Sequence, residues 1–127
     1  MGMLLRDEGL VPDVIISSTA RRARKTAVRV SQSCGFAGEV VFEEQLYLAG
    51  PEKYVQLLHA MADDHARVLM VGHNPGVEQL LEDLTGEIEA LPTAAVAQVL
   101  LPVPVCHEVV LARNAQLINL WRPRELK

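Results

Sequence analysis

The stretch VLMVGHNPG, from Val68 to Gly76, joins a short apolar run to a glycine, a histidine and Asn-Pro-Gly. An apolar run that ends at a glycine is typical of a strand buried on both faces of a parallel sheet. Asparagine and proline begin helices, so Asn74 is expected to cap a helix that Pro75 opens. The stretch therefore predicts a strand over residues 67–71 followed at once by a helix, with His73 in the loop between them.

The same alternation of strands and helices runs through most of the chain. Runs of β-branched and apolar residues predict strands, and apolar residues at i, i+3 and i+4 predict helices. Strands are expected at residues 14–17, 39–43, 67–71, 95–101 and 116–121, and helices at 1–8, at 20–34, from 51 and from 75. This order favours an α/β fold with a mostly parallel sheet, helices on both faces and a C-terminal antiparallel hairpin. No shift in composition divides the chain, so residues 1–127 are expected to form a single domain.

Composition narrows the class of protein. Half of the 127 residues are hydrophobic, 22% are charged, and the formal net charge is -4. A protein that grips nucleic-acid phosphates is usually basic, so no nucleic-acid partner is expected. No apolar run reaches the roughly 18 residues of a membrane span, so no membrane association is expected. The cysteines, Cys34 and Cys106, form no CxxC pair, which favours a reduced cytoplasmic protein.

Two strand ends carry polar residues that favour a ligand site, because ligands of open α/β sheets bind beyond the carboxyl ends of strands. The first strand leads into SSTARRARKTA, residues 17–27, where Ser18 and Thr19 are suited to cap a helix and Arg22 lies one turn inside it. Free amides at a helix N-terminus and the planar fork of an arginine both favour a phosphate. His73 comes from the other strand end. Ser18, Arg22 and His73 together therefore favour a phosphoryl-binding pocket.

Plainer interpretations of these residues remain open. The basic helix can be a capped helix with a solvated face, because arginine is normally exposed. His73 can be a loop histidine that only satisfies a hydrogen bond. The glycine before it, Gly72, is explained equally by a ligand or by another element of the fold, because either can require the backbone to pass close by. His59 and His65 are expected at a solvated helix end and outside any site.

SSTARRARKTA and VLMVGHNPG, together with LPTAAVA at residues 91–97, resemble the motifs of the histidine phosphatase superfamily, in particular its SixA-type phosphohistidine phosphatases. The motifs stand in the family's order over essentially the whole chain, and the resemblance implies a phosphoglycerate mutase-like three-layer sandwich. It also implies that Arg22 is the arginine of the Ser-x-x-x-Arg-Ala motif and Ser18 its serine. His73 would be the second histidine, which holds the phosphoryl group, and Asn74 a neighbouring pocket residue. His73 and Arg22 are thus the catalytic candidates.

The resemblance implies a hydrolase that removes a phosphoryl group from phosphohistidine in a protein or from a small phosphate ester. In such enzymes the histidine of an Arg-His-Gly motif attacks phosphorus, and water then hydrolyses the phosphohistidine that forms. The chain contains no Arg-His-Gly, so no nucleophile is expected within these residues. Gln45 stands where relatives often carry an acid, and neither a metal nor a cofactor is implied.

The absent motif belongs to a strand that would precede the opening helix. Ordinary element lengths give about 20–40 residues for the strand, loop and half helix that are missing. Loss of a central strand would leave the neighbouring strands with unpaired backbone groups. Three interpretations stay open: a start codon set too late, a truncated relative that binds phosphate or a phosphoprotein without turnover, and a partner chain, as in a homodimer, that supplies the strand by swapping.

Overall fold

The computed structural model describes residues 2–61, 65–104 and 106–123. In chain order, the elements are α1 (Gly2–Asp7), β1 (Val14–Ser18), α2 (Arg21–Cys34), β2 (Val41–Glu43), α3 (Pro51–His59), β3 (Val68–Val71), α4 (Gly76–Thr85), β4 (Val96–Leu100) and β5 (Gln116–Trp121). Short 3-10 helices, Glu44–Leu46 and Cys106–Glu108, lie in two of the loops. This order of elements confirms the α/β prediction.

Local sequence explains several of the element boundaries. β1 is VIISS, whose β-branched residues favour extended backbone. α3 begins at Pro51, since the fixed φ of proline suits the first turn of a helix. α2 ends where Gly35 adopts φ 78°, a left-handed conformation that glycine takes without strain.

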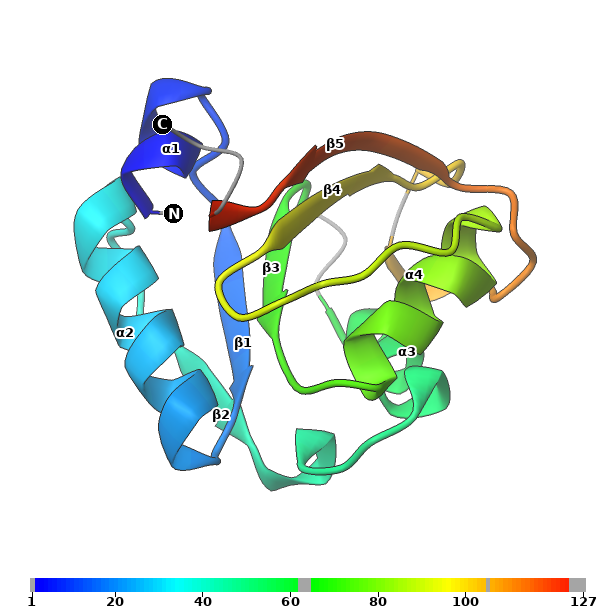
Figure 1. The fold of residues 1–127 in the computed structure, drawn as a ribbon, viewed down its shortest axis with the longest axis horizontal. Helices are drawn as coiled ribbons and strands as arrows, with labels where there is room; N and C mark the ends of the chain where they lie inside the picture. The colour runs from blue at the N-terminus through cyan, green and yellow to red at the C-terminus, as the bar shows by residue number, and fades with distance from the viewer. Residues whose placement is uncertain (1, 62–64, 105, 124–127) are drawn as a thin grey trace.

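Three strands form a parallel sheet in the order β2-β1-β3. Ser17 lies beside Val71 of β3 and beside Phe42 of β2. Because the strands are parallel, their carboxyl ends meet at one edge of the sheet, the lower edge in Figure 1. The chain passes from β1 into α2 and from β3 into α4 at this edge.

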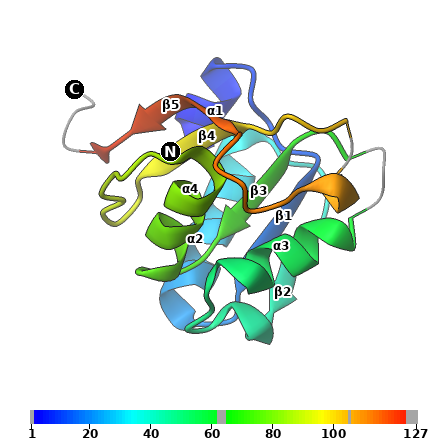
Figure 2. The ribbon, with the colours of Figure 1, turned by 90° about the vertical axis from the view of Figure 1, so that its right-hand side faces the viewer.

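Helices cover both faces of the parallel sheet. Leu69 packs with Leu5, Val30 and Cys34, and so faces α1 and α2. Its neighbours along β3, Val68 and Met70, face the other way, into the core with α3 and α4. Figure 1 shows α2 on one side of the strands and the α3–α4 pair on the other, and Figure 2 looks onto that pair with the strands behind. The predicted layering is confirmed.

β3 is less buried than its sequence predicts. The run VLMV was expected to be buried on both faces, but all of its residues are only half-buried, whereas every residue of β1 is buried. The cause is strand pairing: in the described part of the chain β3 is hydrogen-bonded only to β1, and β4 pairs only with β5 in a separate antiparallel sheet. Val96 and Val99 of β4 nevertheless pack against the same core clusters as β3.

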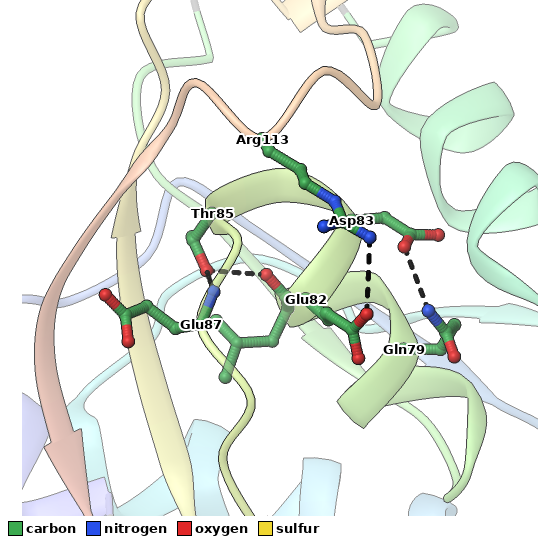
Figure 3. Close-up of polar contacts among 7 residues, drawn as sticks. Gln79, Glu82, Asp83, Thr85, Glu87 and Arg113 are labelled. Carbon is green, nitrogen blue, oxygen red and sulfur yellow. Dashed lines mark hydrogen bonds and ion pairs between the residues drawn. The ribbon is translucent and has the colours of Figure 1, made fainter.

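Polar contacts tie the end of α4 to the segment before β5. The backbone N–H of Arg113 donates to the carbonyl of Asp83 at 3.0 Å, and its guanidinium lies 3.4 Å from the Glu82 carboxylate. Gln79 donates to the Asp83 side chain at 2.9 Å, and the Glu87 N–H donates to Thr85 Oγ1 at 3.0 Å (Figure 3). These contacts fix the hairpin relative to α4. Within the described residues, no helix is long and apolar enough to cross a bilayer.

Candidate functional site at the carboxyl ends of the parallel strands

Ser18 and His73 meet where β1 and β3 end. The Ser18 Oγ lies 2.7 Å from His73 Nε2, although the residues are 55 positions apart in the chain. Ser18 is fully buried, and His73 is half-buried. The parallel pairing of β1 with β3 produces this contact, because it brings the residues that follow each strand to the same edge.

The Ser18 hydroxyl also binds backbone. Its Oγ accepts a hydrogen bond from the Ala20 N–H at 3.2 Å, so the hydroxyl proton is free to be donated to His73 Nε2. The imidazole can equally donate from Nε2 to Oγ, and the choice depends on the tautomer. In either arrangement the buried serine fixes the position of the histidine ring.

The predicted capping of α2 by Ser18 and Thr19 is wrong. The N-cap is Ala20, and no side chain caps the helix, because the Ser18 hydroxyl points to His73 and to the Ala20 N–H. The first-turn amides of α2 have no intrahelical acceptor, which leaves them able to bind an anion. No acidic residue stands in that first turn to compete.

Arg22 lies in the first turn of α2, four residues after Ser18, and is exposed. The structure does not bring it into contact with Ser18 or His73, and it makes no hydrogen bond or ion pair with another described residue. Its donors face solvent at the end of the helix nearest Ser18, and they are available to a phosphate.

Tyr54 packs beneath the loop that carries His73. A Cβ at Gly72 would collide with the Tyr54 hydroxyl oxygen, so only glycine fits there. That oxygen accepts a long hydrogen bond, 3.4 Å, from the His73 backbone N–H. Burial raises the pKa of the Tyr54 phenol, and the His73 N–H lowers it in part. The expected close approach at Gly72 is confirmed, and the neighbouring element is α3.

Tyr47 approaches the His73 ring from the loop after β2. Their ring centroids lie 5.8 Å apart with an interplanar angle of 78°, an edge-to-face arrangement. Tyr47 is 59% exposed, so it stands at the rim of the site. Sequence reasoning placed neither Tyr47 nor Tyr54 at the site, because no local signal links either tyrosine to residue 73.

Asn74 does not cap α4 as predicted. The helix has Pro75 at its N-cap and no capping side chain, because the Asn74 amide donates to the Leu91 carbonyl at 2.7 Å instead. The Leu91 N–H in turn donates to the Glu78 carboxylate at 2.6 Å. Asn74 is exposed and anchors the segment before β4, beside the predicted pocket.

His59 and His65 lie outside this site. His59 is exposed, as expected for the end of α3, and its Nε2 lies 2.7 Å from the Val109 carbonyl oxygen. His65 Nδ1 is buried with no hydrogen-bond partner among the described residues. In that same part of the chain, no group of three or more His, Cys, Asp or Glu is placed to hold a metal ion.

Comparison with solved structures identifies proteins of the same fold. A protein assigned as a phosphohistidine phosphatase SixA from Agrobacterium tumefaciens superposes with a TM-score of 0.71 and 28% identity, over 96% of this chain and 75% of that one. A protein histidine phosphatase SixA complexed with tungstate gives a TM-score of 0.81 and 21% identity, over 99% and 78% of the two chains. A protein from Nakamurella multipartitia that is likewise assigned as a phosphohistidine phosphatase SixA gives a TM-score of 0.76 and 22% identity, over 96% of this chain and 77% of that one.

Sequence comparison adds one relative. Uncharacterized protein ML1117 of Mycobacterium leprae (strain TN) is 32% identical over 72 residues, which are 57% of this chain. The match spans only 42% of the length of that relative. No protein-family model matches the chain.

Proposed function

Because this chain is a structural relative of the SixA-type histidine phosphatases, we propose that it is a phosphatase-like protein whose site binds the phosphoryl group of a phosphohistidine in a protein or of a small phosphate ester. One observation carries the proposal: the Ser18 Oγ holds His73 Nε2 at 2.7 Å at the carboxyl ends of two paired strands. The uncapped N-terminus of α2 begins three residues after Ser18.

Each residue of the pocket has a distinct part in this proposal. His73 donates a hydrogen bond from its imidazole to a phosphoryl oxygen, and Ser18 keeps the ring in place. Arg22 supplies a planar fork of donors to the other oxygens, as the negative charge on them grows during transfer. The open amides of α2 add a fixed positive potential. Asn74 holds the wall of the pocket through Leu91.

Turnover needs a nucleophile that these 127 residues do not contain in an Arg-His-Gly motif. In the proposed reaction, an imidazole nitrogen of a histidine on another segment attacks phosphorus, and the bond from phosphorus to the leaving group breaks. The leaving nitrogen or oxygen takes a proton. Water then attacks the phosphohistidine, which releases inorganic phosphate and restores the imidazole.

The open strand edges support a place for that segment. In the described chain β3 has a hydrogen-bonded neighbour on one side only, and so has β4. Both strands pack against shared core clusters and both are partly exposed. An added strand between β3 and β4 would pair with both and merge the two sheets. It would end beside His73 if it ran parallel to β3.

A second candidate follows from the missing motif. Without a nucleophile, the same pocket binds phosphate or a phosphorylated protein and performs no hydrolysis. The Ser18–His73 pair and the α2 N-terminus serve this function equally well, because holding a phosphoryl group requires only donors.

The two candidates are separated by comparing two forms of the protein. The 127-residue chain and a chain extended by any in-frame codons upstream of Met1 are assayed for phosphate release from phosphohistidine. The phosphatase proposal expects an Arg-His-Gly in the extension, activity in the extended chain only, and a loss of at least about 100-fold on His73→Ala, as for removal of a transition-state donor. An extension without that motif favours the binding function, and activity that survives His73→Ala contradicts the assigned pocket.

A further inference from the structure

Helix α2 carries an unusual concentration of positive charge. Its sequence RRARKTAVRVSQSC contains five basic residues and no acidic ones, while the chain as a whole has a net charge of -4. Cations in a first helical turn and like charges spaced i, i+4 both disfavour a helix. The buried face of α2 consists of Ala23, Ala27, Val30 and Cys34, so the packing of this face does not require the basic residues.

Three of these residues form a continuous line, which we name the basic stripe: Arg21, Lys25 and Arg29. They are spaced i, i+4 and i+8, so they lie on one face over a length of about 12 Å. All three are exposed, and α2 forms one flank of the molecule (Figure 1). The stripe starts at the end of α2 nearest Ser18 and His73, which is where the proposed phosphoryl group binds.

The cations of the stripe have no partners among the residues that the structure describes. Arg21, Lys25 and Arg29 make no hydrogen bond or ion pair with any described residue, whereas Arg24 stacks at 4.4 Å over the Phe42 ring. Like charges along one helix face, without counter-charges beside them, attract an anionic surface of another molecule.

The carboxylates of α4, unlike the cations of the stripe, have partners within the chain. Glu82 of α4 pairs with Arg113 at 3.4 Å, Asp83 accepts from Gln79 at 2.9 Å, and Glu78 accepts from the Leu91 N–H at 2.6 Å. These carboxylates already have partners, so a second copy of the chain offers no comparable set of free anions from α4. The occupant is instead indicated by position: the stripe adjoins the proposed phosphoryl site at the N-terminus of α2, so the protein that carries the phosphoryl group is the one brought against it.

We propose that the basic stripe docks an acidic surface of the phosphorylated protein whose phosphoryl group enters the site at the N-terminus of α2. This inference rests on the proposed phosphoryl-binding function and adds the character of the substrate: a protein with carboxylates along the surface that adjoins its phosphorylated residue. Exposed charges of this kind accelerate association and select partners, and their effect falls as salt screens them.

The test uses two synthetic helical peptides that carry a stable phosphonate analogue of phosphohistidine. One has glutamates four and eight residues from the analogue, and the other has glutamines there. Their affinities for the 127-residue protein are measured by fluorescence anisotropy at low and at physiological ionic strength. The acidic peptide is expected to bind about 10-fold more tightly at low salt, with a smaller advantage at higher salt.

Lys25→Glu is the decisive variant, and Lys53→Glu is its matched control. Both replace an exposed helical lysine with glutamate, but Lys53 is on α3, across the sheet from the stripe. Lys25→Glu should abolish the preference for the acidic peptide. Its affinity for the glutamine peptide should stay within about 3-fold of the parent, because an exposed and screened charge contributes little to binding. Lys53→Glu should leave the preference unchanged.

Several results would overturn the inference about the stripe. Each can be told apart from a failure of the phosphoryl pocket. Equal binding of the two peptides, or equal effects of the two variants, removes the stripe from recognition. Tighter binding of duplex DNA or of phosphatidylserine vesicles than of the acidic peptide, lost on Lys25→Glu, would assign the stripe to those ligands. Self-association lost on Lys25→Glu would assign it to a second copy. If the acidic preference is seen but removing the phosphonate leaves the affinity of both peptides unchanged, the stripe stands and the phosphoryl pocket fails.

Discussion

At the residue scale, the position of His73 depends on the packing of its own backbone. Gly72 has no Cβ because the Tyr54 hydroxyl occupies that space, and the same hydroxyl accepts the His73 N–H. Tyr54 is fully buried. The loop therefore rests on a rigid aromatic support, while the buried Ser18 hydroxyl fixes the ring from the other strand.

Gly72→Ala is expected to reduce the free energy of unfolding by about 1–3 kcal/mol, because the new methyl group overpacks against Tyr54. Tyr54→Phe removes the nearest atom in this collision and costs about 1 kcal/mol for its lost hydrogen bond. The alanine substitution should therefore cost less in the Tyr54→Phe background, with a coupling energy of about 0.5–3 kcal/mol. Urea unfolding of the two single variants, the double variant and the parent measures it.

Gly50→Ala is the control for this cycle. A Cβ at Gly50 would approach only the flexible end of the Glu52 side chain, 3.0 Å away. It should show no coupling with Tyr54→Phe. Strictly additive effects for Gly72→Ala and Tyr54→Phe would mean that the tyrosine does not support the loop.

At the element scale, local sequence accounts for most of the helices and strands. The β-branched run of β1, Pro51 at the start of α3 and Gly35 at the end of α2 act on their own neighbours, so sequence reasoning could use them. Two predictions were wrong for a shared reason: the burial of β3 and the capping by Asn74 depend on distant segments. β3 lacks a second hydrogen-bonded neighbour in the described chain, and Asn74 bonds to Leu91, 17 residues away.

Asp13 links the start of β1 to the start of β3. Its carboxylate accepts hydrogen bonds from the N–H groups of Ala66 and Arg67 at 2.8 and 2.9 Å. The backbone N–H groups of Arg67 and then Ala66 lower the pKa of Asp13 from its ordinary value of 3.8. This contact stabilises the alignment of the two strands whose ends form the candidate site.

The lowered pKa of Asp13 fixes the sign of a pH effect. Since the folded state favours the carboxylate, its contribution is fully present above the ordinary value of 3.8 and is lost as pH falls through the lowered pKa. Asp13→Asn should therefore destabilise the protein at neutral pH, and the difference from the parent should shrink in strong acid. Urea midpoints measured from neutral pH to about pH 2 test this.

Asp7→Asn serves as the control, because among the described residues the Asp7 carboxylate contacts only the adjacent Arg6, at 3.4 Å, on the surface. It should have little effect on the urea midpoint at neutral pH. A constant difference between Asp13→Asn and the parent across the whole pH range would show that the charge of Asp13 contributes nothing to strand alignment.

At the scale of the whole molecule, the candidate site depends on how strands that are distant in the sequence pair with one another. Sequence reasoning chose Ser18 and His73 from the ends of two predicted strands, and their contact follows from the pairing of β1 with β3. The pairing of strands, however, is a long-range property, so the separation of β4 and β5 from β3 could not be read from local patterns. Arg22 stays exposed in the structure, and its role in phosphate binding is a prediction that a ligand must test.

The central claim is that the ends of β1 and β3, with the N-terminus of α2, bind a phosphoryl-like anion. Titration of the 127-residue chain with tungstate, the ion bound in one SixA relative, tests this claim most directly. Calorimetry should give one site. His73→Ala should weaken it about 10- to 100-fold, the value of one hydrogen bond to a charged group, and Ser18→Ala should weaken it as well, because the His73 ring loses the contact that holds it.

Ser17→Ala is the matched control, because it removes a neighbouring, equally buried hydroxyl that donates only to the Ser18 carbonyl. Its affinity for tungstate should stay within about 3-fold of the parent, as expected of a hydroxyl that makes no contact with the anion. Absence of tungstate binding, or equal affinity in the parent and His73→Ala, would contradict a phosphoryl site at these strand ends.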